Sequence, residues 1–259
     1  FIFKGKKDLD ITNYNLLQQY FHNTKIDYLI NCAAFTNVDA CEKNRIHANL
    51  VNNIAVGHLA DLCKKFKVKF IHISTDYVFD GEKKGEYSED DKTNPVNFYG
   101  QTKLEGEKKF LNKKLKDSII IRTSWLYSDE KNNFLTNFLK RIKDKSELMM
   151  VTDLISSPTS AYDLARDILE ILKKLKFENA QIFHYSNSGY CSRHKFCEKF
   201  LSILDIKKNL KKISVNRFEI NRPKNSVLSC NKFFTHFKIN QSDWLDSLVF
   251  VTKRIESGI

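Results

Sequence analysis

The sequence predicts an α/β protein with a Rossmann-like, doubly wound parallel sheet and a smaller C-terminal α/β lobe. Apolar runs of strand length alternate with segments of helical spacing, which is the pattern of right-handed βαβ units. The chain has 259 residues, of which 42% are hydrophobic. That length and composition suffice to bury a substantial core and are not those of a disordered chain.

The expected elements follow one another in βαβ order. We expect strands at residues 27–34, 69–75, 117–125, 147–152 and 181–186. We expect a helix beginning near Tyr14 and further helices at residues 39–66, 97–112, 132–143, 160–174 and 192–204. In the helix at 39–66 the apolar residues fall on one side, as they do in a helix packed on a sheet.

The last part of the chain, from residue 213 on, contains the turn NRPKNSVL and two more helical stretches. No Gly-, Ser- or Pro-rich linker separates the two halves, so we expect the second lobe to be woven onto the first. We assign residues 1–155 to one domain and residues 156–259 mainly to the smaller lobe.

Neither a membrane protein nor a secreted one is expected. The apolar runs are far shorter than the roughly 18 residues of a membrane helix, and the N-terminus FIFKGKKDLD is too charged for a signal peptide. The six cysteines form no CxxC pair and have no histidine at metal-ligand spacing. We therefore expect a cytoplasmic protein with free thiols, without a disulfide framework or a zinc site.

The formal net charge of +12 leaves two interpretations open. The Lys and Arg residues are spread along the chain beside acidic or apolar neighbours, which is typical of a solvated surface. A basic surface would also attract a diphosphate-bearing ligand. Nucleic-acid binding is not expected, because no recognition motif accompanies the charge.

Tyr99 and Lys103, in FYGQTKLEGE, could carry proton-transfer chemistry. Four residues apart in an expected helix, they lie on one face about one turn from each other. A free tyrosine has a pKa of about 10, and a neighbouring ammonium group lowers it by favouring the phenolate. Such a pair can deliver a proton to a carbonyl oxygen as a hydride reaches the carbon. Because YxxxK also arises by chance in lysine-rich chains, the pair alone is a weak signal.

Ser74, Thr75 and Asp76 follow the expected strand KFIHI. Ligands bind outside the carboxyl ends of strands in open α/β sheets, and a hydroxyl there can hydrogen-bond a carbonyl oxygen that becomes negative during reduction. The alternative is that Ser74 or Thr75 simply caps the end of the strand.

Two other segments have a functional and a structural interpretation. The small residues of NCAA (31–34) would let a flat cofactor lie close to the backbone, or they form a tight turn into the next helix. Asp10 could hydrogen-bond an adenine amine while Ile11 packs on the ring. Alternatively, Asp10 or Thr12 caps the helix that begins near Tyr14.

Taken together, nine segments resemble the dTDP-4-dehydrorhamnose reductase family, within the extended short-chain dehydrogenases/reductases. The most specific are HISTDYVFDG (72–81) and YGQTKLEGE (99–107). The others are LDIT (9–12), INCAAFTNVDACE (30–42), VNNIAVGHLA (51–60), IRTSWLY (121–127), NNFL (132–135), SSPTSAYDLA (156–165) and RPKNSVL (222–228). They occur in family order over nearly the whole chain.

The resemblance implies an NAD(P)-binding domain, a C-terminal lobe that binds a nucleotide sugar, and an activity. The implied reaction is the NADPH- (or NADH-) dependent reduction of the C4 ketone of dTDP-4-dehydro-L-rhamnose to dTDP-L-rhamnose, a precursor of cell-surface polysaccharide. Thr75, Tyr99 and Lys103 fall on the family's catalytic positions. Thr75 would hold the carbonyl group, Tyr99 would donate the proton, and Lys103 would bind the nicotinamide ribose and tune Tyr99.

The resemblance also implies ligand contacts. The cofactor-binding positions are Asp10, Ile11, Ala33, Ala34, Phe35, Thr36, Ile73, Tyr99 and Lys103. The substrate-binding positions are Thr75, Asp76 and Trp125, although Trp125 could equally belong to the core. No metal ligand is identified, and a homodimer is left open.

The chain departs from the family pattern at two places. The Gly-rich loop that cradles the cofactor pyrophosphate is absent, and the chain starts at Phe1 with only eight glycines. We expect a chain that lacks its first strand and helix, roughly 30 residues, and therefore binds NADPH poorly. The family usually reads DQxGxPT where this chain has DLISSPT (153–159), so Leu154 and Ser156 leave the exact sugar open.

Other functions remain as alternatives. A dehydratase or epimerase could share the fold, but dehydratases generally carry an acidic pair where this chain has Asp76 and Tyr77. A reductase of a related nucleotide-linked 4-keto sugar would fit the same motifs. A non-catalytic regulatory subunit resembling the methionine adenosyltransferase β subunit is the third alternative. The intact set of Thr75, Tyr99 and Lys103 favours catalysis without deciding it.

Overall fold

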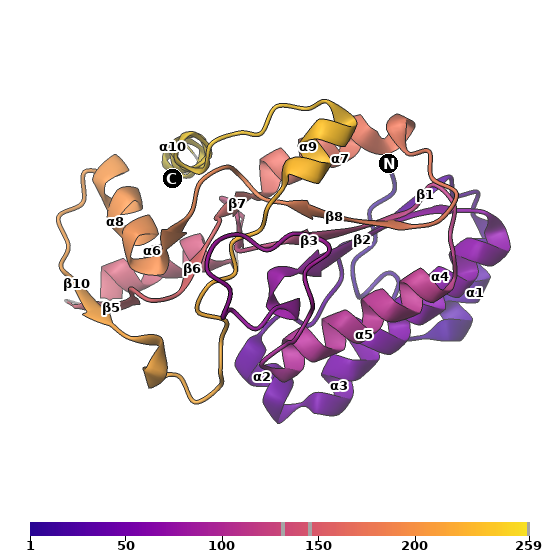
Figure 1. Cartoon of the computed structure of the whole chain (residues 1–259), viewed down its shortest axis with the longest axis horizontal. Helices are drawn as coiled ribbons and strands as arrows, with labels where there is room; N and C mark the ends of the chain where they lie inside the picture. Colours follow the sequence, from indigo (N-terminus) through magenta and orange to yellow (C-terminus); the bar gives the residue numbers. More distant parts are fainter. Residues whose placement is uncertain (131–132, 145–146, 258–259) are drawn as a thin grey trace. The chain divides into compact units, whose positions relative to one another are not determined.

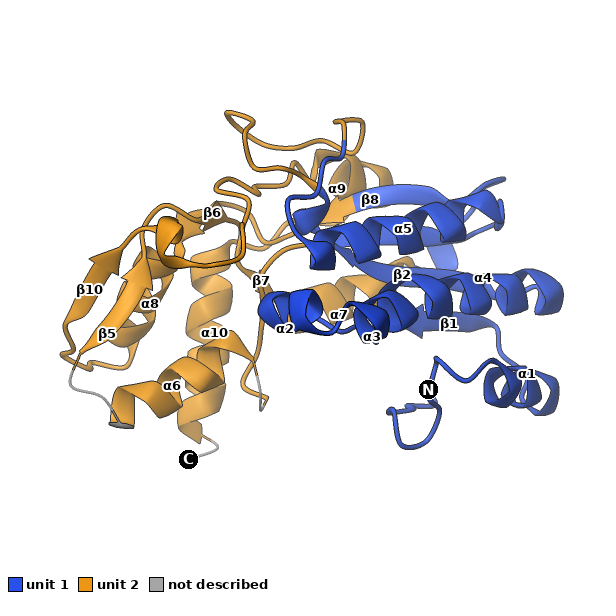
Figure 2. Ribbon diagram, turned by 90° about the horizontal axis from the view of Figure 1, so that it is seen from below, with its two compact units in different colours: residues 1–78, 93–122, 172–183 blue, residues 79–92, 123–171, 184–259 orange. Residues whose placement is uncertain are grey.

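The computed structural model describes residues 1–130, 133–144 and 147–257 (Figure 1). The chain forms two compact units, each composed of three separate segments (Figure 2). Unit 1 contains residues 1–78, 93–122 and 172–183, and unit 2 contains residues 79–92, 123–171 and 184–259. The domain boundary expected at residue 155 stays a prediction.

Unit 1 holds the main sheet and the helices beside it. Its helices are α1 (Tyr14–Asn23), α2 (Val38–Lys43), α3 (Arg45–Asn49), α4 (Ala55–Phe66) and α5 (Phe98–Asn112). Three short turns are η1 (Leu50–Ile54), η2 (Asp76–Val78) and η3 (Leu172–Lys174). The strands are β1 (Tyr28–Asn31), β2 (Lys69–Thr75), β3 (Ile119–Thr123) and β8 (Gln181–Tyr185), of which the last two end in unit 2.

The four strands form one sheet in the order β1-β2-β3-β8. β1 pairs with β2 in parallel, with Tyr28 opposite Lys69 and Asn31 opposite His72. Helices α4 and α5 run side by side along this sheet (Figures 1 and 2). Apolar side chains of α1, α4 and α5 enclose Phe70 of β2 and Ile120 of β3 in a common core. The predicted parallel α/β fold is confirmed.

The helix expected at residues 39–66 is broken in two places. Asn44 leaves the helical region, with φ −127° and ψ 60°, and separates α2 from α3. The five-residue turn η1 is a π-helix between α3 and α4. Its Asn52 is buried and binds the backbone of Phe35, with the Phe35 N–H donating at 2.8 Å and Asn52 Nδ2 donating to the Phe35 carbonyl at 3.0 Å. The π-helical turn thus places Asn52 against the backbone of Phe35, and the spacing of apolar residues could not predict this contact.

Unit 2 contains short sheets surrounded by helices. Its helices are α6 (Phe134–Asp144), α7 (Ala161–Ile171), α8 (Arg193–Ile203), α9 (Asn231–Phe237) and α10 (Trp244–Ser257), with the short turn η4 (Val215–Arg217). Its strands are β4 (Leu126–Tyr127), β5 (Leu148–Val151), β6 (Ile155–Ser156), β7 (Thr159–Ser160), β9 (Cys191–Ser192) and β10 (Leu210–Ile213). Side chains of α6, α8 and α10 pack together on β5.

Three expectations about strands and helices need correction or limits. The strand at 147–152 pairs not with the main sheet but with β10, a lysine-rich segment that we did not expect to be a strand. The strand expected at 117–125 is shortened at both ends, because Asp117 and Trp125 have positive φ values of 50° and 44°. Residue 132, the expected first residue of a helix, lies outside the described residues.

Among the residues that the structure describes, no helix is both long enough and apolar enough to span a membrane.

Gly100 lets α5 lie against the backbone of η2. A Cβ at this position would overlap the carbonyl oxygen of Tyr77. Because backbone cannot move aside as a flexible side chain can, Gly100→Ala is expected to lower the free energy of unfolding by about 1–3 kcal/mol, measured by urea denaturation. Gly5→Ala is the control, since its nearest new contact is an ordinary 3.5 Å to Asp8. Equal stabilities of the two variants would contradict this account of α5.

Candidate active site

Helix α5 carries three polar side chains on one face. Tyr99, Lys103 and Glu107 are spaced four residues apart, so they follow one another along the helix. The helix begins at a defined point because Asn97 Oδ1 accepts the Gly100 N–H at 2.9 Å. The position of Tyr99 on its first turn is therefore set by the cap.

A buried ion pair joins α5 to the sheet. Arg122 of β3 donates from Nη2 to Glu107 Oε2 at 2.8 Å and from Nε to Glu107 Oε1 at 3.0 Å. Ser74 of β2 donates to the same carboxylate at 2.5 Å. The Glu107 and Arg122 side chains are only 1% and 4% exposed, so the ion pair is almost fully excluded from water. It joins three elements, namely α5, β3 and β2.

Thr75 lies at the carboxyl end of β2 and close to Tyr99. Its hydroxyl donates to Asp76 Oδ1 at 2.9 Å and accepts the Tyr77 N–H at 3.2 Å. Burial raises the pKa of the Tyr99 phenol, and the hydrogen bond with Thr75 opposes that rise. Tyr99 is therefore a protonated phenol at neutral pH. The structure thus brings together the predicted pair of Thr75 and Tyr99.

Lys103 lies beneath the same strand end and is 1% exposed. Its Nζ donates to the carbonyl of Ile73 at 2.6 Å. Burial lowers the pKa of Lys103 to about 8, although the Glu107 carboxylate favours the ammonium form. Burial and the hydrogen bond with Thr75 have the largest effects on the pKa of Tyr99, and the tuning of Tyr99 by Lys103 stays a prediction.

The segment after the carboxyl end of β1 contains two alanines, and hydrogen bonds hold its backbone at Ala33 and Phe35. Ala33 and Thr36 are exposed, whereas Ala34 and Phe35 are half-buried. The Ala33 N–H donates to Asn31 Oδ1 at 3.1 Å, and Asn52 holds both backbone polar groups of Phe35. The segment is thus held at Ala33 and Phe35 by hydrogen bonds, and at Ala33 it exposes only a methyl group beside the backbone.

Asp10 and Ile11 belong to the segment before α1. Asp10 Oδ1 accepts two hydrogen bonds from Thr12, at 2.9 Å from its N–H and 2.7 Å from its hydroxyl. The bond from the Thr12 N–H lowers the pKa of Asp10, which is therefore ionised. Ile11 packs on the core of unit 1. The cap of α1 is Asn13, so neither Asp10 nor Thr12 has the capping role.

Trp125 lies in unit 2, where the backbone leaves β3. Its ring centre is 4.7 Å from that of Phe196 and 5.4 Å from that of Phe134, and the Arg193 guanidinium lies 5.4 Å from the ring. Its buried Nε1 has no hydrogen-bond partner among the described residues. Trp125 is thus partly a core residue, and it retains one N–H that a ligand could bind.

Several residues at this site escaped the sequence analysis as candidates. Glu107, Arg122, Asn52 and His72 are polar, buried and bonded to residues far away in the chain. One signal was available, because Glu107 continues the four-residue spacing of Tyr99 and Lys103. No local pattern links the other three to the site.

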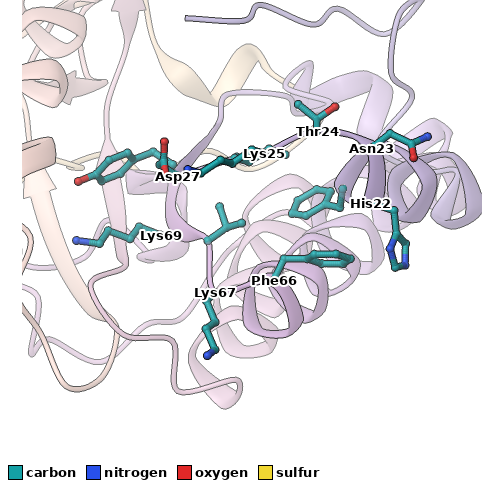
Figure 3. A pocket seen from close by; sticks show the side chains of 12 residues that line it. His22, Asn23, Thr24, Lys25, Asp27, Phe66, Lys67 and Lys69 are labelled. Atoms are coloured by element: carbon teal, nitrogen blue, oxygen red, sulfur yellow. The ribbon is translucent and has the colours of Figure 1, made fainter.

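A separate hollow of about 700 Å³ lies at the other end of the sheet. Its lining residues, 21–28 and 66–69, lead into β1 and β2 and include the first residue of each, whereas the candidate site lies at the other ends of these strands. Figure 3 shows Lys25, Lys67, Lys69 and Asp27 around it. It is therefore distinct from the candidate active site. Within residues 1–130, 133–144 and 147–257, no group of three or more His, Cys, Asp or Glu residues could hold a metal ion.

Comparison with known proteins yields consistent matches. A family model described as the RmlD substrate binding domain matches residues 2–257. The spore coat polysaccharide biosynthesis protein SpsK of Bacillus subtilis is 35% identical over 245 residues, covering 94% of this chain and 84% of that protein. A solved dTDP-4-dehydrorhamnose reductase from Clostridium acetobutylicum superimposes with a TM-score of 0.91 at 34% identity, over 98% of this chain and 90% of that one. The Bacillus anthracis enzyme of that name, in complex with NADP, gives a TM-score of 0.90 at 33% identity, over 97% and 89%.

Glu107→Gln is expected to lower the free energy of unfolding by about 3–5 kcal/mol, because it removes the buried negative charge that the Arg122 guanidinium binds. Glu105→Gln is the matched control on the same helix. Its pair with Lys108 is exposed, and such pairs contribute at most about 1 kcal/mol. Chemical denaturation measures both variants, and a loss in Glu107→Gln no larger than in the control would contradict the role assigned to the buried pair.

Proposed function

Because the chain belongs to the family of the RmlD substrate binding domain, we propose that it is an NADPH-dependent oxidoreductase that reduces the C4 ketone of dTDP-4-dehydro-L-rhamnose to dTDP-L-rhamnose. Two solved relatives, each about a third identical over nearly all of this chain, are named dTDP-4-dehydrorhamnose reductase. One of these is in complex with NADP.

The observation that carries the proposal is the grouping of Thr75, Tyr99 and Lys103 around the end of β2. The Tyr99 phenol is protonated and hydrogen-bonded to Thr75, and the Lys103 amine is bound to the carbonyl two residues before Thr75. Proton delivery to a carbonyl oxygen requires an acid and a second polar group near that oxygen, and Tyr99 and Thr75 supply these two groups side by side.

The residues at the carboxyl ends of β1 and β2 fit a nicotinamide cofactor. Exposed Ala33 leaves room for a flat ring beside the backbone, and ionised Asp10 can accept hydrogen bonds from an adenosine. We assign cofactor contacts to Asp10, Ile11, Ala33, Ala34, Phe35, Thr36, Ile73, Tyr99 and Lys103. The bound cofactor supplies the hydride that reduces the ketone carbon.

Tyr99 and Thr75 act on the oxygen of the ketone. Tyr99 donates its phenolic proton as negative charge develops on that oxygen, and the Thr75 hydroxyl holds the oxygen in place. The raised pKa of Tyr99 keeps the phenol protonated at neutral pH, as a proton donor must be before the reaction, but it also makes the phenol a weaker acid. The Lys103 ammonium, present below its pKa of about 8, stabilises negative charge at the site.

Substrate contacts are assigned to Thr75, Asp76 and Trp125. The unpaired Nε1 of Trp125 supports this, because a ligand acceptor would satisfy a buried donor. Leu154 is buried and Ser156 half-buried in the segment where the family usually has Gln and Gly, so a related nucleotide-linked 4-keto sugar is the alternative substrate. All six cysteines are free thiols, which suits a reducing compartment, so we place the enzyme in the cytoplasm.

The full natural chain is expected to oxidise NADPH when dTDP-4-dehydro-L-rhamnose is added, because the ketone accepts the hydride. Absorbance at the NADPH band measures the rate, and calorimetry with NADPH alone measures cofactor binding. Bound cofactor without turnover would reject the reductase and favour a non-catalytic subunit.

Tyr99→Phe is expected to lower the turnover number at least about 100-fold, since it removes the proton donor while keeping the ring. Tyr14→Phe, which removes an exposed hydroxyl on α1, is the matched control and is expected to keep full turnover. Circular dichroism checks that both variants fold. Undiminished turnover in Tyr99→Phe would show that the proton comes from another group.

A further inference from the structure

A line of buried polar side chains lies beneath Lys103 and has no part in the mechanism above. Asn31 ends β1, His72 lies in the middle of β2, and both are almost fully buried, at 4% and 0% exposed. The two residues pair directly across the parallel strands. Buried polar groups at such a position require partners, and these partners define how the protons are arranged.

The orientation of the Asn31 amide is fixed by its neighbour. Asn31 Oδ1 accepts the backbone N–H of Ala33 at 3.1 Å, so the NH₂ group must point the other way. That NH₂ group lies 3.2 Å from His72 Nδ1. An amide NH₂ only donates hydrogen bonds, so His72 Nδ1 must be the acceptor and carry no proton.

The proton of neutral His72 is therefore on Nε2. Complete burial, with the nearby Lys103 charge, holds the pKa of His72 well below its usual value, so the ring is neutral. Its Nε2 lies 3.5 Å from Lys103 Nζ. The ring thus directs an N–H at the lysine, whose own Nζ already donates to the Ile73 carbonyl.

This arrangement discriminates between the two forms of Lys103. An ammonium group has only donors, so it cannot accept the His72 N–H, whereas a neutral amine has a lone pair that can. The other groups facing Lys103 favour the ammonium form: Glu107 on α5 and Cys32 after β1. The Glu107 carboxylate is, however, already shared by Arg122 and Ser74.

We propose that Asn31 and His72 are positioning residues that keep Lys103 ready to lose its proton. Asn31 fixes the His72 proton on Nε2, and that N–H favours the neutral amine. The charge of Lys103 would then depend on the ligand bound beside it, because an anionic ligand favours the ammonium form. This meaning for catalysis rests on the proposed function, whereas the proton arrangement itself does not.

Nitrogen-15 NMR of histidine-labelled protein tests the proton arrangement without any activity. The two neutral tautomers give different ring nitrogen shifts, and the signal lost in His72→Gln assigns the resonance. The expected result is an Nε2–H tautomer that does not titrate between pH 6 and pH 9. A proton on Nδ1, or a charged ring in this range, would overturn the proposal.

Asn31→Asp tests the effect on Lys103. A carboxylate accepts from Nδ1, so the proton moves there and Nε2 becomes an acceptor for the ammonium group. Cys32→Asp is the matched control, because it adds the same charge beside Lys103 from the next residue and offers no group that fixes the His72 proton. NMR of lysine-labelled protein then follows the Lys103 side chain, whose signal is assigned by its loss in Lys103→Arg. The pH dependence of that signal gives the midpoint of the Lys103 titration.

The midpoint in Asn31→Asp is expected to exceed that in Cys32→Asp by at least about 1 pH unit. Equal midpoints would show that charge alone acts, and would overturn the role of His72. If the enzyme turns over, its pH–rate profile should move with this midpoint. A shifted midpoint in a protein without reductase activity would reject the proposed function and leave the inference standing.

Discussion

Arg122 and Glu107 meet between β3 and α5 with almost no exposure to water, and Ser74 of β2 completes the contact. Two unpaired charges in such a place would cost several kcal/mol each, so the helix is stable only where the two groups meet. The bidentate geometry also fixes the rotation of α5 about its axis. Everything that α5 presents to the end of the sheet depends on this one contact.

Once α5 is held there, its own periodicity arranges the site. Lys103 comes one turn before Glu107 and Tyr99 one turn before Lys103, so both face the carboxyl end of β2. Close backbone contacts keep this register, since a Cβ at Gly100 would overlap η2 and one at Gly106 would overlap η1. The chemistry therefore depends on backbone packing as much as on the reacting groups.

Local patterns predicted the main elements well, because strands 69–75 and helix 97–112 depend on apolar runs and capping signals that lie within them. They did not predict the π turn, which exists because Asn52 reaches the backbone of Phe35. The lysine-rich strand β10 was missed because only its pairing with β5 makes it a strand. The YxxxK motif predicted that Tyr99 and Lys103 lie at the site. The ion pair of Glu107 and Arg122 joins separate segments of the chain, so no local sequence pattern could predict it.

The central chemical step proposed for this chain is the transfer of a hydride from a nicotinamide cofactor to C4 of a nucleotide-linked sugar. The most direct measurement uses NADPH deuterated at the transferring position of C4 of the nicotinamide, with dTDP-4-dehydro-L-rhamnose and the full natural chain. If the chain transfers this hydride, the product is a dTDP-rhamnose with one deuterium, and proton NMR locates that deuterium at C4 of the sugar. A product without deuterium there, or with deuterium at another carbon, would contradict it.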